Sequence, residues 1–117
     1  MPSSNPALRF RLLLDSEHAI GPGKTDLLEA IARSGSISAA AREMAMSYKR
    51  AWQLVDELNR SFATPLVTTA KGGTRGGGAA LTPRGAQVLD AYRSLEQRAQ
   101  KLLAAELRSL GHLCTKK

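Results

Sequence analysis

The chain has 117 residues, which allows one domain, and its 17 basic and 10 acidic side chains give a formal net charge of +7. This balance favours a polyanionic partner, and the alternative is a basic surface kept for solubility. The single cysteine, Cys114, excludes an intramolecular disulfide, and His18 and His112 lie too far apart in sequence to indicate a metal site. No apolar run approaches the roughly 20 residues of a membrane span, and no signal peptide is recognisable, so we expect a cytoplasmic protein without metal or cofactor.

The N-terminal third predicts an arm, a short strand and a helix. Residues 1–7 are polar, contain two prolines and are expected to form a loose arm. Apolar residues recur at every second position from Leu8 to Leu14, which predicts a short strand. Gly21-Pro22-Gly23 breaks the chain before a helix that should start near Lys24 or Thr25 and end at Ser34-Gly35.

Two further helices are expected to follow, joined by a tight turn. Ser36 is a plausible N-cap for a helix over residues 37–44, and Ser47 for a helix that reaches about Ser61. Ala45-Met46 would form the turn between them. The small side chains of the Ser-x-Ser-Ala-Ala-Ala run permit a close crossing of the two helices, which is the arrangement of a helix-turn-helix motif.

The second helix of this pair is amphipathic, and its phase separates a core face from a free face. The residues at helical spacing that should face the core are Ala51, Leu54, Val55 and Leu58, whereas Lys49, Gln53, Asp56 and Arg60 lie opposite. A recognition helix contacts bases mainly through its N-terminal turns, so the expected groove contacts are Ser47, Lys49, Arg50 and Gln53. The alternative is an amphipathic helix with a merely solvated face. For Trp52, core packing under the hairpin or at a subunit contact is favoured over base contact.

Pro65 ends this helix region, and a hairpin should follow. Residues 66–69 are strand-like, residues 72–78 form a glycine-rich turn, and residues 79–81 can return as a second strand. Lys71 and Arg75 flank the glycines and suit phosphate or minor-groove contact. The alternative is that the loop is only an irregular hairpin tip. The complete set of candidate DNA-binding residues is Ser36, Ser47, Tyr48, Lys49, Arg50, Gln53, Lys71, Thr74 and Arg75.

Thr82-Pro83 then starts a last helix that is expected to reach about Leu110, leaving residues 111–117 as a basic tail. This helix carries an apolar stripe formed by Val88, Tyr92, Leu95, Ala99 and Leu102. Because little else in so short a chain can cover the stripe, we expect pairing with a second copy of the chain.

An enzymatic function is not supported by the sequence. Gly21-Pro22-Gly23-Lys24-Thr25 looks like the end of a phosphate-binding loop, but the pattern needs a glycine where His18 stands. Cys114 has no base beside it and is a poor nucleophile candidate. We therefore expect no catalytic residues.

These residues resemble the N-terminal DNA-binding domain of ModE-type molybdate-responsive regulators, over roughly residues 8–105. The matching segments are Gly21 to Ile31, Ser34 to Ser38, Ser47 to Trp52, the glycines at 72–73 and 76–78, and Leu81 to Gly85. The Ser-x-Ser-Ala-Ala-Ala part is shared with LysR-type regulators. The resemblance implies an α+β, mostly helical winged helix-turn-helix, paired through its N- and C-terminal helices and acting on promoters of molybdenum-related genes. It places the DNA face on Ser47 to Gln53 and on the glycine wing.

Full-length members of that family add a C-terminal pair of small β-barrel domains that bind the oxyanion, and the printed sequence ends at Lys117. Three modes of regulation stay open: constitutive DNA binding, cooperation with a separate oxyanion-binding protein, or another signal. The leading hypothesis is a homodimer of one domain, residues 8–110, whose terminal helix (about 83–110) dimerises and which binds a palindromic operator in double-stranded DNA. The alternative is a dimeric module that docks another regulator rather than DNA.

Overall fold

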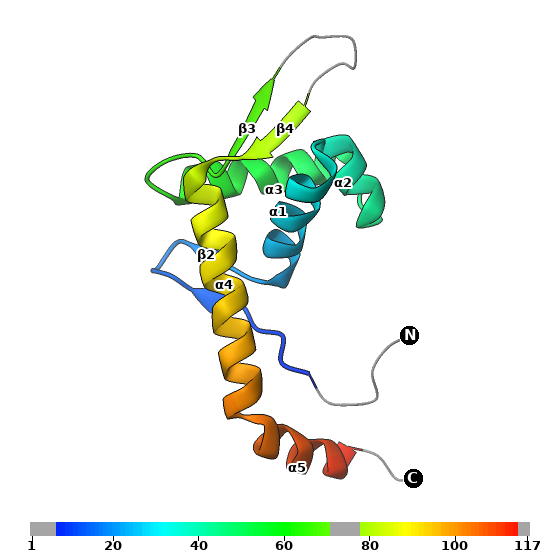
Figure 1. Ribbon diagram of the computed structural model, residues 1–117, viewed down its shortest axis with the longest axis vertical. Helices are drawn as coiled ribbons and strands as arrows, with labels where there is room; N and C mark the ends of the chain where they lie inside the picture. The colour runs from blue at the N-terminus through cyan, green and yellow to red at the C-terminus, as the bar shows by residue number, and fades with distance from the viewer. Residues whose placement is uncertain (1–6, 71–77, 115–117) are drawn as a thin grey trace.

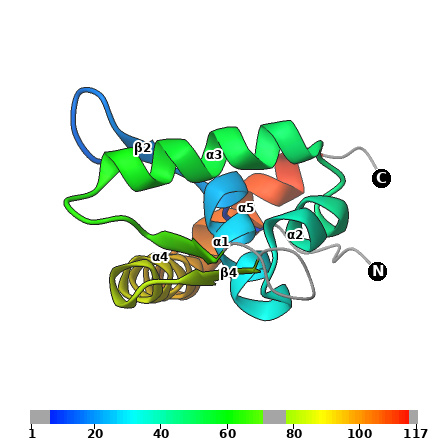
Figure 2. The same ribbon diagram turned by 90° about the horizontal axis from the view of Figure 1, so that it is seen from above.

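A computed structural model describes residues 7–70 and 78–114 of the chain. In chain order its elements are β1 (Leu12–Leu13), β2 (Ala19–Ile20), α1 (Pro22–Ser34), α2 (Ile37–Glu43), α3 (Tyr48–Ser61), β3 (Val67–Ala70), β4 (Gly78–Leu81), α4 (Pro83–Leu102) and α5 (Ala104–Cys114). The first three helices lie together beside the β3–β4 hairpin, and α4 extends away from them to α5 (Figure 1). From above, α3 runs along one side of the molecule, and α4 is seen nearly end-on (Figure 2). This arrangement is the α+β winged helix-turn-helix that the sequence predicts.

Side-chain caps fix where the helices begin. The hydroxyls of Ser36, Ser47 and Thr82 each accept a hydrogen bond at 3.0 Å from the backbone N–H three residues further on. All three helix starts were predicted from these residues. Helix α1 begins earlier than predicted, at Pro22, because proline has no N–H to leave unsatisfied in a first turn.

The hydrophobic core lies where α1, α2 and α3 meet the base of the hairpin. Leu27, Leu28 and Ile31 of α1 are fully buried. Ala40 of α2 and Ala51 of α3 are also fully buried, and α2 and α3 contact each other. Alanine side chains at these places let the two helix backbones approach closely, as the sequence suggested. The core therefore holds α3 in a fixed orientation relative to α2.

The N-terminal segment differs from the expected strand over residues 8–14. Only Leu12–Leu13 is a strand, and it pairs with Ala19–Ile20. The preceding residues lie against α4 instead: Gln100 Oε1 accepts a bond from the N–H of Leu8 at 2.8 Å, and the Tyr92 hydroxyl donates to the Phe10 carbonyl at 2.6 Å. Burial of Tyr92, aided by the charge of Glu96, raises the pKa of its hydroxyl and keeps this donor protonated.

The hairpin is held in place by hydrogen bonds to its backbone groups. Strands β3 and β4 pair antiparallel, from Val67 opposite Leu81 to Ala70 opposite Gly78. The Asn59 amide oxygen accepts bonds from the N–H groups of Leu66 and Val67 at 2.8 and 3.0 Å, and its nitrogen donates to the Val67 carbonyl at 3.2 Å. On the other side, the N–H of Ala79 donates to the carbonyl of Gly35 at 2.9 Å. The hairpin, or wing, is therefore held by Asn59 of α3 and by Gly35 at the end of α1.

Helix α4 is shorter than predicted, because the helical run breaks at Leu103 and resumes as α5. The upper part of α4 is fixed to α1 by Arg93. Its guanidinium donates to Asp26 at 2.7 Å, to Glu29 at 2.6 Å and to Glu96 at 2.8 Å. Partial burial opposes the charged form, but these three carboxylates outweigh it and raise the pKa of Arg93. Nearer its C-terminal end, α4 contacts the N-terminal segment through Gln100.

Candidate nucleic-acid interface

The phase of α3 agrees with the sequence prediction on both faces. Ala51, Leu54, Val55 and Leu58 are buried, with exposed fractions between 0 % and 6 %. The residues expected on the opposite face, Lys49, Gln53, Asp56 and Arg60, are all exposed. The helix is therefore anchored by one apolar face and offers the other to solvent along its whole length.

Charge is distributed unevenly along that exposed face. At the C-terminal end, Arg60 pairs with Asp56 at 3.3 Å, and Glu57 pairs with Lys24 at 3.2 Å. Within residues 7–70 and 78–114, neither Lys49 nor Arg50 has a carboxylate partner. The positive charge of α3 is thus concentrated in its first turns, where the unpaired N–H groups of a helix also favour an anion.

The polar candidates around these cations have defined roles. Arg50 Nη1 lies 3.5 Å from the amide oxygen of Gln53, so the two side chains sit side by side on adjacent turns. Ser47 is exposed and caps α3, and its hydroxyl proton can still be donated to a phosphate. Ser36 caps α2 and is only half exposed, so its observed role is structural.

Three predicted contacts, Lys71, Thr74 and Arg75, lie outside the described residues. The pairing of the two strands on either side of them ends with Ala70 opposite Gly78.

Trp52 does not pack in the core of this chain, which corrects the expected packing under the hairpin, whereas the alternative, a subunit contact, stays a prediction. Its side chain is 38 % exposed, and its ring lies edge-on to that of Tyr48, with the ring centroids 6.2 Å apart. The reason is the helix phase: at about 100° per residue, Trp52 lies more than a quarter of a turn from the centre of the buried face.

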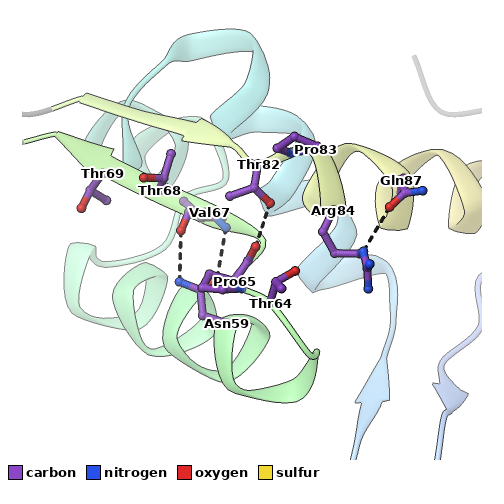
Figure 3. Close-up of a pocket in the computed structure, with 10 residues that line it drawn as sticks. All are labelled: Asn59, Thr64, Pro65, Val67, Thr68, Thr69, Thr82, Pro83, Arg84 and Gln87. Atoms are coloured by element: carbon purple, nitrogen blue, oxygen red, sulfur yellow. Dashed lines mark hydrogen bonds between the residues drawn. The ribbon is translucent and has the colours of Figure 1, made fainter.

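Sequence reasoning missed two exposed arginines near the motif. Arg42 on α2 donates to the Ser38 hydroxyl at 3.1 Å, and Arg84 at the start of α4 donates to Gln87 at 3.1 Å. Arg84 lines an open depression of about 660 Å³ beside the wing, which Thr64, Thr68 and Thr69 also border (Figure 3). Arg84 lies two residues after the cap Thr82, so its position at the start of α4 could have been inferred from that cap.

The residues that looked like a phosphate-binding loop have structural roles. Lys24 pairs with Glu57 and donates to the Ala19 carbonyl, and the Thr25 hydroxyl donates to the Gly21 carbonyl at 3.0 Å. The described residues include no group of three or more His, Cys, Asp or Glu placed to hold a metal ion. Nor does any helix in the described part of the chain combine the length and hydropathy that crossing a membrane requires.

Comparisons with known proteins agree with this geometry. The chain is 50 % identical over 92 residues to the molybdenum-pterin-binding protein MopB of Rhodobacter capsulatus, covering 79 % of this chain and 34 % of MopB. It is 42 % identical over 101 residues to the molybdenum transport protein ModE of Azotobacter vinelandii, covering 83 % and 37 %. With the transcriptional dual regulator ModE of Escherichia coli K12 it shares 44 % identity over 80 residues, covering 68 % and 30 %. The predicted resemblance to ModE-type proteins is confirmed.

The chain spans about a third of the length of these curated relatives. Among solved structures, a MarR family transcription regulator superposes with a TM-score of 0.59 at 19 % identity, covering 79 % of this chain and 62 % of that one, which supports the winged-helix fold. Residues 24–86, from α1 through the wing to the start of α4, match the family model described as bacterial regulatory helix-turn-helix protein, lysR family. The chain therefore belongs to the lysR family of bacterial regulatory helix-turn-helix proteins.

Proposed function

We propose that this chain is a sequence-specific DNA-binding regulator that lays the first turns of α3 in the major groove. The observation that carries the proposal is the exposed start of α3, where Lys49 and Arg50 are not neutralised by any described carboxylate. Lysine and arginine suit guanine acceptors or phosphates, and Gln53 can pair with adenine through two hydrogen bonds. The names of the relatives, which include molybdenum proteins and ModE regulators, support molybdenum-related genes as the targets.

The same proposal includes a homodimer. Exposed leucines continue along α4 and α5, although leucine is favoured inside proteins: Leu95, Leu102, Leu103 at the break between the helices, Leu110 and Leu113. Pairing these faces with a second copy would bury them and set two α3 helices on a symmetric site. In a dimer of the usual helix-turn-helix geometry, the two helices enter the major groove about 34–36 Å apart, which requires a palindromic operator.

The test begins with selection of bound duplexes from a random pool, with and without molybdate. A palindromic consensus is the expected result. The molybdate arm distinguishes a chain that responds to the oxyanion by itself from one that binds constitutively, needs a separate oxyanion-binding protein or takes another signal. Failure to enrich any sequence would contradict the proposal.

Replacing Lys49 or Arg50 by alanine tests the assignment of α3 on the selected duplex. A side chain that contacts a base should contribute on the order of 1–3 kcal/mol, and its loss should relax specificity at one position. A side chain that contacts only phosphate should weaken all duplexes and reduce the salt slope by about one unit. Arg60→Ala removes the same charge from the same helix, but Asp56 already neutralises Arg60, so a smaller effect is expected.

The exposed leucines also support a second candidate, a module that docks another regulator through an apolar contact. Ionic strength separates the two functions. DNA affinity should fall steeply with salt because counterions are released from the phosphates, whereas an apolar protein contact should persist.

A further inference from the structure

The first turns of α3 expose two large aromatic rings next to the cations. Tyr48 is 56 % exposed and Trp52 is 38 % exposed. The aliphatic side chains of α3, in contrast, are buried: Ala51, Leu54, Val55 and Leu58. The rings contact each other edge-to-face, at an interplanar angle of 79°. Two exposed aromatic rings in contact beside cations without a carboxylate partner favour a binding surface over a solvated face.

The charges around the rings indicate what the partner is. Lys49 follows Tyr48, Gln53 follows Trp52, and the first acidic residue of the helix, Asp56, is paired with Arg60. A partner that fits both features combines negative charge with apolar groups within reach of the first turns of α3. The major groove of DNA does so, because phosphates line its edges and the 5-methyl group of thymine is the apolar group among its base edges.

We propose, on the basis of the DNA-binding function proposed above, that Tyr48 and Trp52 determine specificity by contacting thymine methyl groups. Lys49, Arg50 and Gln53 supply hydrogen bonds to the polar edges of neighbouring bases. The two rings supply apolar contact, which polar side chains of the same turns cannot provide. The operator half-site should then contain thymines at the positions that face the start of α3.

The experiment compares the selected duplex with the same duplex in which deoxyuridine replaces thymine in one half-site. This change removes only the 5-methyl groups. Wild-type protein should bind the deoxyuridine duplex about fourfold more weakly for each methyl group contacted. Trp52→Ala should bind the thymine duplex more weakly than wild type and lose most of this discrimination, and Tyr48→Ala should reduce it. Trp52→Phe should keep part of it.

Lys49→Ala is the matched control, since it lies between the two rings in sequence but offers no aromatic contact. It should weaken binding to both duplexes by the same factor and leave the thymine-to-deoxyuridine ratio unchanged. Circular dichroism of each variant checks that the helices are intact. Trp52 is also the only tryptophan of the chain, so its emission reports on this site alone. Bound duplex should protect it from quenching by acrylamide.

The results distinguish a failure of the thymine contacts from a failure of DNA binding itself. If wild type binds no duplex at all, the proposed function fails. If it binds its operator but does not distinguish thymine from deoxyuridine, the function stands and the thymine assignment is overturned. Discrimination that survives in Trp52→Ala and Tyr48→Ala would also overturn the assignment and leave the rings as a surface for a protein partner.

Discussion

Gly85 has the closest packing of the described glycines. It lies in the first turn of α4 and is buried, and the position that a Cβ would take is 2.1 Å from the carbonyl oxygen of Leu66. The same oxygen accepts a hydrogen bond from the N–H of Thr82 at 2.9 Å. Because the obstacle is backbone rather than a flexible side chain, an added methyl group can be accommodated only if α4 or the wing moves.

We therefore expect Gly85→Ala to destabilise the fold by at least about 1–3 kcal/mol, the usual cost of overpacking. Gly23→Ala is the control, because a Cβ there meets no atom within 4 Å and Gly23 is also helical. It should leave stability unchanged or raise it slightly, since alanine favours helix over glycine. The measurement is the midpoint of urea unfolding for both variants. Equal midpoints would contradict the packing argument.

Residue roles could be predicted from the sequence where one local rule determined them. Helix phase placed Lys49 and Gln53 outside and Leu54 inside, and hydroxyl caps located the starts of α2, α3 and α4. The predicted packing of Trp52 under the hairpin was wrong because a large aromatic residue at the edge of a helix face is buried only if a neighbouring element covers it. Which element lies there is decided by tertiary structure and not by the local pattern.

At the scale of elements, α1 and α4 are joined by ion pairs. The Arg93 side chain is 27 % exposed and contacts carboxylates of both helices. Arg93→Ala removes the cation that these three carboxylates share, although Asp26 keeps Arg9 at 3.4 Å and Glu29 keeps Arg33 at 3.9 Å. We expect a loss of about 1–3 kcal/mol, the range for hydrogen bonds to charged groups reduced for partial exposure.

Two variants test whether geometry or mere charge matters at this joint. Arg93→Lys keeps the charge but loses the forked donor geometry, so its stability should lie between wild type and Arg93→Ala. Arg60→Ala breaks an exposed pair, with both side chains more than half exposed, and should cost less than about 1 kcal/mol. Thermal and urea unfolding would compare the three. An Arg60→Ala loss as large as that of Arg93→Ala would contradict the assignment.

The elements themselves were predicted unevenly, for physical reasons. The three helices of the motif and the wing were predicted with nearly correct bounds because caps, glycines and Pro65 mark them in the sequence. The β1–β2 hairpin was not predicted, since β2 has only two residues and the connecting turn depends on Asp15, whose carboxylate accepts bonds from Glu17 and His18. The break at Leu103 has no proline or glycine beside it, so local propensity favours an unbroken helix there.

At the scale of the whole molecule, one part of the apolar stripe of α4 is buried in the chain and the other part is exposed. Tyr92 is buried and Val88 packs against the core, whereas Leu95 and Leu102 are 42 % and 80 % exposed. The stripe therefore leaves the core of the chain and continues over an elongated body with extents of 55 × 32 × 21 Å. This continuity supports the proposal that a second copy covers the exposed part.

We expect Leu95→Glu combined with Leu102→Glu to convert a dimer into a monomer, because charged side chains on the contact face would be buried without partners. Folding of each chain should persist, since both positions lie outside the core. Gln97→Glu adds a like charge on the opposite face of α4 and should stay dimeric. Sedimentation equilibrium gives the mass, and operator titration should show weaker binding for the monomer. A wild-type protein that sediments as a monomer would contradict the proposed dimer.

The way in which the wing is attached allows its surface residues to change without changing its orientation. The hairpin is oriented by the carbonyls of Gly35 and Leu66 and by the Asn59 amide, all of which bond to backbone groups. None of these bonds depends on which side chains the strands carry. Substitutions along the exposed positions of β3 can therefore accumulate without tilting the hairpin. The surface that the hairpin presents can therefore vary while its orientation relative to the helices stays the same.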